Sequence, residues 1–129
     1  MVKTDDPANY RRLVEGAWVM RRAGWFYLFF SGDNCCGPQA HYAVMVARSR
    51  NATGPFTIKP ERGGVILEAE KRWIAPGHNS TIRYRGIDQI AYHAVDVNRS
   101  RTRDSDDVNS RRVMLVRKLV WRNGWPELP

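Results

Sequence analysis

The sequence has few of the features that mark membrane or exported proteins. In its 129 residues no run approaches the ~18 apolar residues that a membrane-spanning helix needs, so we expect no membrane partner. The first residues, MVKTDDPANYRR, are polar and lack the apolar stretch of a secretion signal. We therefore expect no signal peptide in this chain, and the localisation is unknown from the sequence.

Cysteine is scarce, since the two cysteines are the adjacent Cys35 and Cys36 in DNCCGP. A lone Cys-Cys pair lacks the spacing and the number of ligands of a structural zinc site. A disulfide between neighbours requires a strained peptide geometry. The sequence therefore favours two free or packed thiols.

Acidic residues are also few, because 13 Asp and Glu stand against 21 Lys and Arg, giving a net charge of +8. A basic balance favours nucleic-acid or membrane-surface binding. The arginines are scattered singly or in pairs, such as Arg21-Arg22, as is typical of solvated strand faces. This disfavours nucleic acid as a partner, although a basic nucleic-acid-associated protein stays an alternative.

No segment gives a convincing helix, and strand-like runs and turns alternate along the chain. GAWVMRRAGWFYLFFSG contains two such runs split by Ala23-Gly24, which is a hairpin signal. HNSTIRYRGIDQIAYHAVD gives two more around Arg85-Gly86-Ile87. The remaining runs are HYAVMVARS, NATGPFTI, GVILEA and RRVMLVRKLVWRNGWPEL.

These runs form two similar units. In each unit a turn, an aromatic-containing strand, a loop and a third strand follow one another, and the units lie roughly 60 residues apart, which fits propeller blades. The sequence predicts an all-β protein of two antiparallel propeller-type blades. We expect one partial propeller domain over residues 1–129, with blade-like units at about 13–70 and 76–127.

Several motifs then occur in a specific order. They are VEGAW, GWFYLFFSG, YAVMVARSRNATGPF, APGHNSTI, DQIAYHAVD and RRVMLVRKLVWRNGWP. In this order they resemble the C-terminal part of glycoside hydrolase family 43, the arabinanases, arabinofuranosidases and xylosidases with five-bladed propellers. The resemblance covers about residues 14–126, well under half of a complete family member. It implies a truncated protein with a partial five-bladed β-propeller.

The resemblance assigns a role to Glu15. Family members carry a general acid in a VEGPW-like segment, and Glu15 stands in that place, with Ala17 replacing the usual Pro. A general acid must hold a proton near neutral pH, which burial or a nearby carboxylate achieves. The aromatic residues of GWFYLFF could supply the apolar setting. The alternative is an exposed glutamate at the end of a strand.

His78 and Arg112 are the other candidate site residues. His78 in GHNS matches a histidine that points into the central channel and helps hold a metal ion in arabinan-cleaving members. This implies calcium or another metal ion near His78 if the channel is completed; no cofactor is otherwise expected, and a hydrogen-bonded histidine is the alternative. Arg112 aligns with an arginine that reaches the sugar, although a solvated Arg111-Arg112 pair is the alternative. His93 is expected to be structural, buried against its strand or paired with Asp96.

The resemblance implies an inverting glycoside hydrolase acting on α-L-arabinofuranosyl linkages, or next on xylosyl linkages. Its partner would be an arabinose- or xylose-containing oligosaccharide. Family members take the catalytic base, an aspartate, from the first blade. None of Asp33, Asp88 and Asp96 stands in such a motif, so we expect the monomer to be inactive.

Two further expectations concern assembly and the alternative function. Bare blade faces predict a homodimer or a higher homo-oligomer. The alternative is a carbohydrate-binding or subunit-type protein that uses the remaining half-site.

Overall fold

The computed structural model describes residues 13–36, 40–98 and 112–129 and confirms the all-β fold. The elements are β1 (Val14–Arg22), β2 (Trp25–Asn34), β3 (His41–Ser49), β4 (Thr57–Ile58), the 3-10 turn η1 (Glu61–Gly64), β5 (Val65–Leu67), β6 (Trp73–Tyr84), β7 (Ile87–Asp96), β8 (Arg112–Lys118), β9 (Val120–Arg122) and β10 (Trp125–Glu127). Within these residues no helix has the length and apolarity to cross a membrane.

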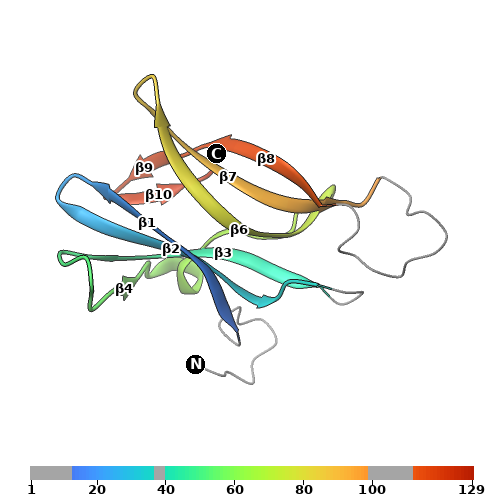
Figure 1. Ribbon diagram of the computed structural model, residues 1–129, viewed down its shortest axis with the longest axis horizontal. Coiled ribbons are helices and arrows are strands. Elements are labelled where there is room, and N and C mark those ends of the chain that lie inside the picture. The colour runs from blue at the N-terminus through green and yellow to red at the C-terminus, as the bar shows by residue number, and fades with distance from the viewer. Residues whose placement is uncertain (1–12, 37–39, 99–111) are drawn as a thin grey trace.

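Two antiparallel sheets make up most of the described structure. Sheet A has the strand order β1-β2-β3-β4, with β5 also paired to β3, and sheet B has the order β6-β7-β8. Figure 1 shows β6, β7 and β8 on one side of the molecule and the strands of sheet A on the other. The division into blade-like units at about 13–70 and 76–127 stays a prediction.

Tight turns join the long strands where the sequence predicted them. Ala23 and Gly24 both have positive φ, of 48° and 75°, and Arg85 and Gly86 repeat this with 49° and 78°. Two successive residues of positive φ match the right-handed twist of an antiparallel hairpin. The predicted hairpins are therefore confirmed. β6, however, begins at Trp73, five residues before the start of the predicted run HNSTIRY, because register shifts between Ile74 and Ser80 hide its alternation.

The main core lies between sheets A and B. Phe29 of β2 and Val46 of β3 point from sheet A, and Ile90 and Tyr92 of β7 meet them from sheet B. Each such side chain contributes about 1.5–3 kcal/mol by leaving water. The opposite face of β2 and β3 packs on β5 in a second cluster that includes Met45. The core thus fixes sheet A against sheet B.

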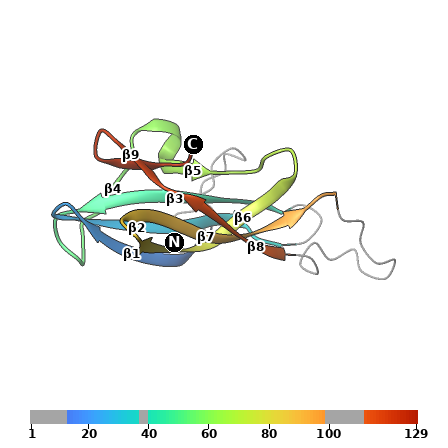
Figure 2. The same ribbon diagram turned by 90° about the horizontal axis from the view of Figure 1, so that it is seen from above.

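The β9–β10 hairpin is fastened to sheet A by an arginine between aromatic rings. The Arg48 guanidinium lies 4.3 Å from the Trp25 ring centroid and 4.1 Å from that of Trp125. Its Nη1 donates to Gly124 O at 2.7 Å, and the Tyr27 hydroxyl donates to the same carbonyl at 2.7 Å. Figure 2 shows β9 and the C-terminus on the same side as β5. Part of the basic charge therefore serves internal packing.

A buried carboxylate joins the hairpin to sheet B. Asp88 Oδ2 accepts from Trp121 Nε1 at 2.8 Å and from Arg22 Nε at 2.9 Å. One acid thereby ties together β1, β7 and β9.

The outer face of sheet B carries exposed apolar side chains. Val116 is paired with Ala91 and Met114 with His93, so Val116 and Met114 share one face of the sheet. Met114 is 77% exposed, Val116 52% and Ile82 59%. Exposed apolar groups of this kind on a sheet face commonly mark a contact surface.

Candidate active site

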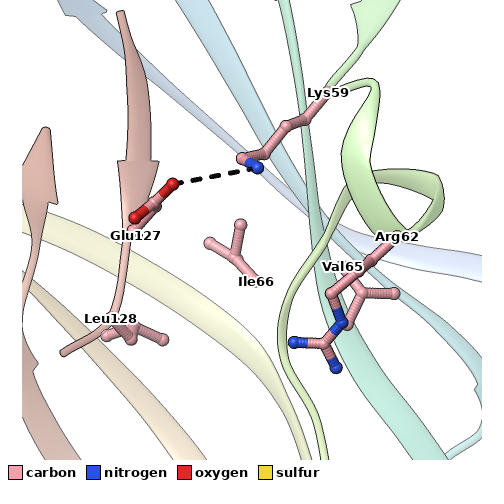
Figure 3. A pocket seen from close by; sticks show the side chains of 6 residues that line it. All are labelled: Lys59, Arg62, Val65, Ile66, Glu127 and Leu128. Atoms are coloured by element: carbon pink, nitrogen blue, oxygen red, sulfur yellow. Dashed lines mark ion pairs between the residues drawn. The ribbon is translucent and has the colours of Figure 1, made fainter. Parts of the chain in front are cut away.

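A pocket of about 180 Å³ lies beside η1, β5 and the C-terminal strand (Figure 3). Its lining residues are Lys59, Arg62, Val65, Ile66, Glu127 and Leu128. The buried Lys59 ammonium is balanced by Glu61 at 2.6 Å and Glu127 at 4.0 Å. None of the predicted site residues lines this pocket, and they meet elsewhere.

Glu15 lies on a β-bulge at the start of β1. Glu15 is paired with Ser31, but the next pair is Trp18 with Phe29, so β1 holds one residue more than β2 here. Gly16, with φ of 61°, takes the left-handed conformation that such a bulge favours. The motif that opens the resemblance is thus a bulge that re-aims an acid.

The neighbour of Gly16 is His78 of β6. A Cβ at Gly16 would lie 3.2 Å from His78 Cα and 3.4 Å from its Cγ. Glycine is therefore favoured here both by backbone conformation and by close contact between the two sheets.

Tyr42 holds the Glu15 carboxyl. Its hydroxyl donates to Glu15 Oε1 at 2.7 Å, and the tyrosine is 1% exposed while Glu15 is exposed. Burial, and then the bond to Glu15, raise the pKa of Tyr42 well above its usual value near 10. The hydroxyl therefore stays a neutral donor across the physiological pH range.

Gly77 makes the space for the Tyr42 ring. A Cβ at Gly77 would lie 2.0 Å from Tyr42 Cε1, much closer than any real contact. The glycine of the GHNS motif thus places Tyr42, and Tyr42 in turn places Glu15.

His78 is held by its backbone. It has φ of 49°, a left-handed conformation that is uncommon for a residue other than glycine, and its N–H donates to Ser31 Oγ at 2.7 Å. The residue is exposed, and its ring centroid lies 6.4 Å from that of His93. Such local strain is concentrated at functional sites in proteins.

His93 lies behind the candidate acid. Its ring is nearly parallel to the Tyr42 ring, with centroids 6.1 Å apart. Burial, followed by the nearby charges of Arg112 and His78, lowers the pKa of His93 to about 4, so it is neutral at pH 7. Of the two alternatives expected for His93, the structure shows burial, since its Nδ1 lies inside the protein; the pair with Asp96 is wrong, and Asp96 accepts from Arg72 at 2.9 Å. Residues three apart on a strand point to opposite faces.

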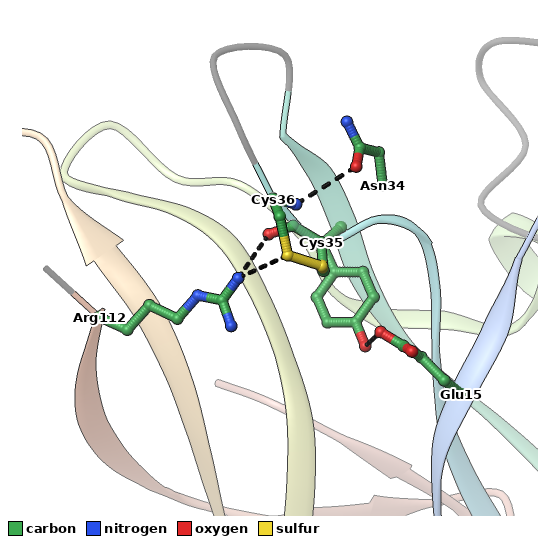
Figure 4. Close-up of a disulfide and its surroundings, with 6 residues drawn as sticks. Glu15, Asn34, Cys35, Cys36 and Arg112 are labelled. Carbon is green, nitrogen blue, oxygen red and sulfur yellow. Dashed lines mark hydrogen bonds between the residues drawn. A yellow bond between two sulfur atoms is a disulfide. The ribbon is translucent and has the colours of Figure 1, made fainter. Parts of the chain in front are cut away.

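Arg112 approaches the same cluster from β8. It is paired with Val95, and since Val95 and His93 share a face of β7, so does Arg112. Arg112 Nη2 donates to Cys36 Sγ at 2.9 Å and to Cys35 O at 3.1 Å (Figure 4).

The two cysteines form a disulfide, which corrects the expectation of free or packed thiols. The chain turns directly after β2, where Cys36 N–H donates to Asn34 Oδ1 at 3.3 Å. In a turn, unlike a strand, neighbouring side chains are not forced to opposite sides. The two sulfur atoms can therefore meet.

Glu15, His78 and Arg112 thus come from three strands of two sheets and surround Tyr42 and His93. All three side chains contribute electrostatically to the pKa of His93.

The aromatic residues that follow Glu15 in the sequence do not surround its carboxyl group. Trp18 Nε1 donates to Thr81 at 2.9 Å, and the aromatic rings of β2 largely enter the core. The catalytic, substrate-binding and metal-binding roles of the three residues stay predictions.

The described residues do not fit a metal centre by themselves. Among them no group of three or more His, Cys, Asp and Glu side chains is arranged to hold an ion. His93 Nδ1 is buried without a hydrogen-bond partner, and His78 lies nearby, so two imidazoles are available. A metal ion near His78 therefore stays a proposal that needs further ligands.

Sequence reasoning missed Tyr42, Ser31 and the role of Gly77. Tyr42 lies in the apolar run HYAVMVARS and is indistinguishable there from a core residue. Its role arises from pairing between distant strands, for which this single sequence has no local signal.

The comparisons with known proteins identify the family and the fold. The sequence pattern of the family described as glycosyl hydrolases family 43 matches residues 2–126. The chain belongs to this family. Its relatives include an extracellular exo-α-(1→5)-L-arabinofuranosidase from Cellvibrio japonicus, 29% identical over 98% of this chain and 36% of that protein. An extracellular endo-α-(1→5)-L-arabinanase of Bacillus subtilis is 31% identical over 88% of this chain and 33% of that protein.

Solved family 43 structures share the fold. The α-L-arabinanase of Cellvibrio cellulosa superposes with a TM-score of 0.76 at 28% identity, over 90% of this chain and 36% of that one. A structure of that enzyme complexed with arabinohexaose gives a TM-score of 0.73 at 30% identity, with the same coverage. The resemblance and the propeller-type fold are therefore confirmed. The chain spans about a third of the length of these relatives.

Proposed function

We propose that this chain carries the acid side of a family 43 glycoside hydrolase site, with Glu15 as the general acid. The observation that carries the proposal is the 2.7 Å hydrogen bond from Tyr42 to Glu15 Oε1, on a bulge packed against His78. This contact fixes the carboxyl group at an exposed position that a glycosidic oxygen can approach. The burial that a general acid needs is not supplied by the described residues, so the proposal assigns it to the bound sugar. Proton donation to a leaving oxygen typically accelerates such a reaction by ~10²–10⁴-fold.

Arg112 is the proposed sugar-binding residue of this half-site. Its guanidinium presents several N–H donors in a planar fork, and such a fork suits the hydroxyl groups of a sugar. Arg112 lies on the same face as His93 and acts electrostatically on Tyr42 and His93. We therefore propose that it holds a sugar ring beside the acid.

The proposed substrate class is an α-L-arabinofuranosyl oligosaccharide, with xylosyl linkages second. The relatives that support this are named for action on (1→5)-linked arabinan, and one related structure holds arabinohexaose. Structural relatives named as a xylanase and a xylosidase are below 25% identical and support the fold alone.

Inversion needs a second carboxylate that activates water. The buried carboxylates of the described residues already have partners: Asp33 is hydrogen-bonded to His41, and Asp88 and Asp96 form ion pairs with Arg22 and Arg72. We therefore expect the chain by itself to bind sugar with little hydrolysis. Sugar binding without catalysis, as a carbohydrate-binding or subunit-type protein, is the second candidate function, favoured by these ion pairs.

Hydrolysis of linear arabino-oligosaccharides tests the role of Glu15. We expect background rates in water, because no described carboxylate is placed as base. Azide attacks the anomeric carbon without a general base while Glu15 gives its proton to the leaving oxygen. Azide should therefore produce glycosyl azide with the wild-type chain and none with Glu15→Gln. Equal product from both proteins would contradict the assignment.

We also propose that a second copy of the chain packs on the apolar part of the outer face of sheet B; Arg112 and His93 lie on the same face, so the sugar site would border this contact. The exposed side chains of Ile82, Met114 and Val116 support this. Burial of apolar surface contributes about 25 cal/mol of favourable free energy per Å², which this face does not gain while it stays in contact with water. Identical chains usually solve this by closed two-fold association.

A further inference from the structure

The Cys35–Cys36 disulfide lies beside the candidate acid but has no part in the proposed sugar chemistry. Both cysteines are partly exposed at the end of β2, and Figure 4 shows the Arg112 side chain extending toward them from β8. A purely structural disulfide needs neither exposure nor a cation. Here both are present.

Arg112 distinguishes the two sulfur atoms. Its Nη2 is 2.9 Å from Cys36 Sγ, whereas its contact with Cys35 is to the carbonyl oxygen at 3.1 Å. A neighbouring arginine stabilises a thiolate relative to the thiol. The better-stabilised thiolate is also the better leaving group in thiol–disulfide exchange. The geometry therefore makes Cys36 the sulfur that leaves.

Two other charged groups of the described residues near this corner already have partners. Glu15 accepts from the Tyr42 hydroxyl at 2.7 Å, and Asp33 pairs with His41 at 2.9 Å. Among the described residues, Cys36 Sγ accepts from the Arg112 guanidinium, and the Cys36 N–H donates to Asn34 Oδ1. The Arg112 contact favours negative charge at Cys36 Sγ.

We propose that Cys35–Cys36 is a thiol-exchange site in which Cys35 takes the incoming thiol and Cys36 leaves as a thiolate held by Arg112. The partner is a small thiol, which acts as the reductant. Its thiolate attacks Cys35 Sγ, the bond to Cys36 breaks, and the electron pair goes to Cys36. A second thiolate attacks the outer sulfur of the mixed disulfide and releases Cys35. Two small thiols become one disulfide, and two cysteine thiols form after proton uptake.

The reverse reaction gives Cys36 a second role. Its thiolate attacks the Cys35 sulfur of the mixed disulfide, expels the small thiolate and restores the Cys35–Cys36 bond. This exchange needs neither sugar nor Glu15, so it is tested separately from the proposed hydrolase function, although both proposals use Arg112.

Alkylation of the reduced chain tests whether Cys36 is the more reactive of the two cysteines. The chain is reduced, freed of reductant and treated with iodoacetamide between pH 5 and 9, and tandem mass spectrometry separates Cys35 from Cys36. We expect Cys36 to react faster near pH 7, with its half-maximal rate below the pH of about 8.5 that is typical of a free cysteine. Arg112→Gln should slow Cys36 about tenfold at pH 7, one unit of pKa. Arg112→Lys should restore part of the rate.

Arg85→Gln, in the exposed turn between β6 and β7, is the matched control and should leave both rates unchanged. Circular dichroism shows that each variant is folded. With oxidised glutathione, Cys36→Ser should accumulate a stable adduct on Cys35, because the resolving thiol is absent. Equal alkylation of both cysteines in the wild type, or a Cys36 profile unaltered by Arg112→Gln, would overturn the proposal. Two free thiols in the freshly purified, unreduced chain would overturn it as well.

Discussion

Tyr42 connects the exposed candidate acid to the interior of the protein. Tyr42→Phe removes the hydroxyl that donates to Glu15 and leaves the ring in place. Because the exposed carboxylate can turn to water, we expect the free energy of unfolding to fall by about 0.5–1.5 kcal/mol. Urea unfolding of Tyr42→Phe, Glu15→Ala and the double variant measures the coupling. Strictly additive effects would mean that the two side chains do not interact.

His93 makes stability depend on pH. Its pKa is about 4 in the folded chain and near 6.5 when unfolded, so between these values the unfolded chain binds more protons. The stability contributed by neutral His93 is complete above pH 6.5 and is lost as the pH falls toward 4. We expect a loss on the order of 2 kcal/mol.

The measurement is urea unfolding from pH 7.5 to 4 for the wild type and for His93→Gln. Other groups titrate in both proteins, so the difference between the two curves isolates His93. The wild type should lose more stability than the variant below pH 6.5. Parallel curves would show that His93 titrates normally.

At the scale of elements, the irregular segment of β6 that carries Gly77 positions the site. Gly77→Ala adds a methyl group where the Tyr42 ring lies. Because the ring must shift within a packed core, we expect a loss of about 1–3 kcal/mol. Gly77 does not have a positive φ, so the cost comes from the contact and not from the backbone.

Gly86→Ala is the opposite case and serves as the control. Its φ is 78°, but nothing lies within 4 Å of its Cβ position. It should cost only the backbone penalty of about 1 kcal/mol and leave Tyr42 undisturbed. Tyr42 fluorescence and ring NMR signals should change in Gly77→Ala alone. Unchanged Tyr42 signals in both variants would contradict the packing described for Gly77.

The elements that the sequence predicts well are those whose causes are local. Ala23-Gly24 and Arg85-Gly86 carry their turn chemistry in two residues, and β3 (His41–Ser49) coincides with the predicted run. The bulge at Gly16 and the long start of β6 escape this reasoning, because contact between two sheets determines them. The Cys35–Cys36 bond was missed because the chain bends after β2, and Arg112, which contacts both cysteines, comes from a distant strand. Glu15, His78 and Arg112 were found only through their motifs.

For the whole molecule, the bare face of sheet B predicts self-association. Light scattering at micromolar concentration should report at least twice the chain mass of 14.9 kDa, since two copies cover the apolar face. Met114→Lys should shift the equilibrium toward monomer, because it places a charge on that face. Val19→Lys, an equally apolar exposed site on β1, is the control. A stable monomer in the wild type would defeat this proposal.

The central claim is that Glu15, His78 and Arg112 form one sugar-binding surface around Tyr42. Titration of the isotope-labelled chain with α-(1→5)-arabinotriose, followed by NMR, tests this most directly. We predict weak binding, with the largest shift changes at Glu15, Tyr42, His78 and Arg112, and weaker binding in Arg112→Gln but not in Arg85→Gln. Shift changes confined to the pocket of Lys59 and Glu127, or none at saturating sugar, would contradict the claim.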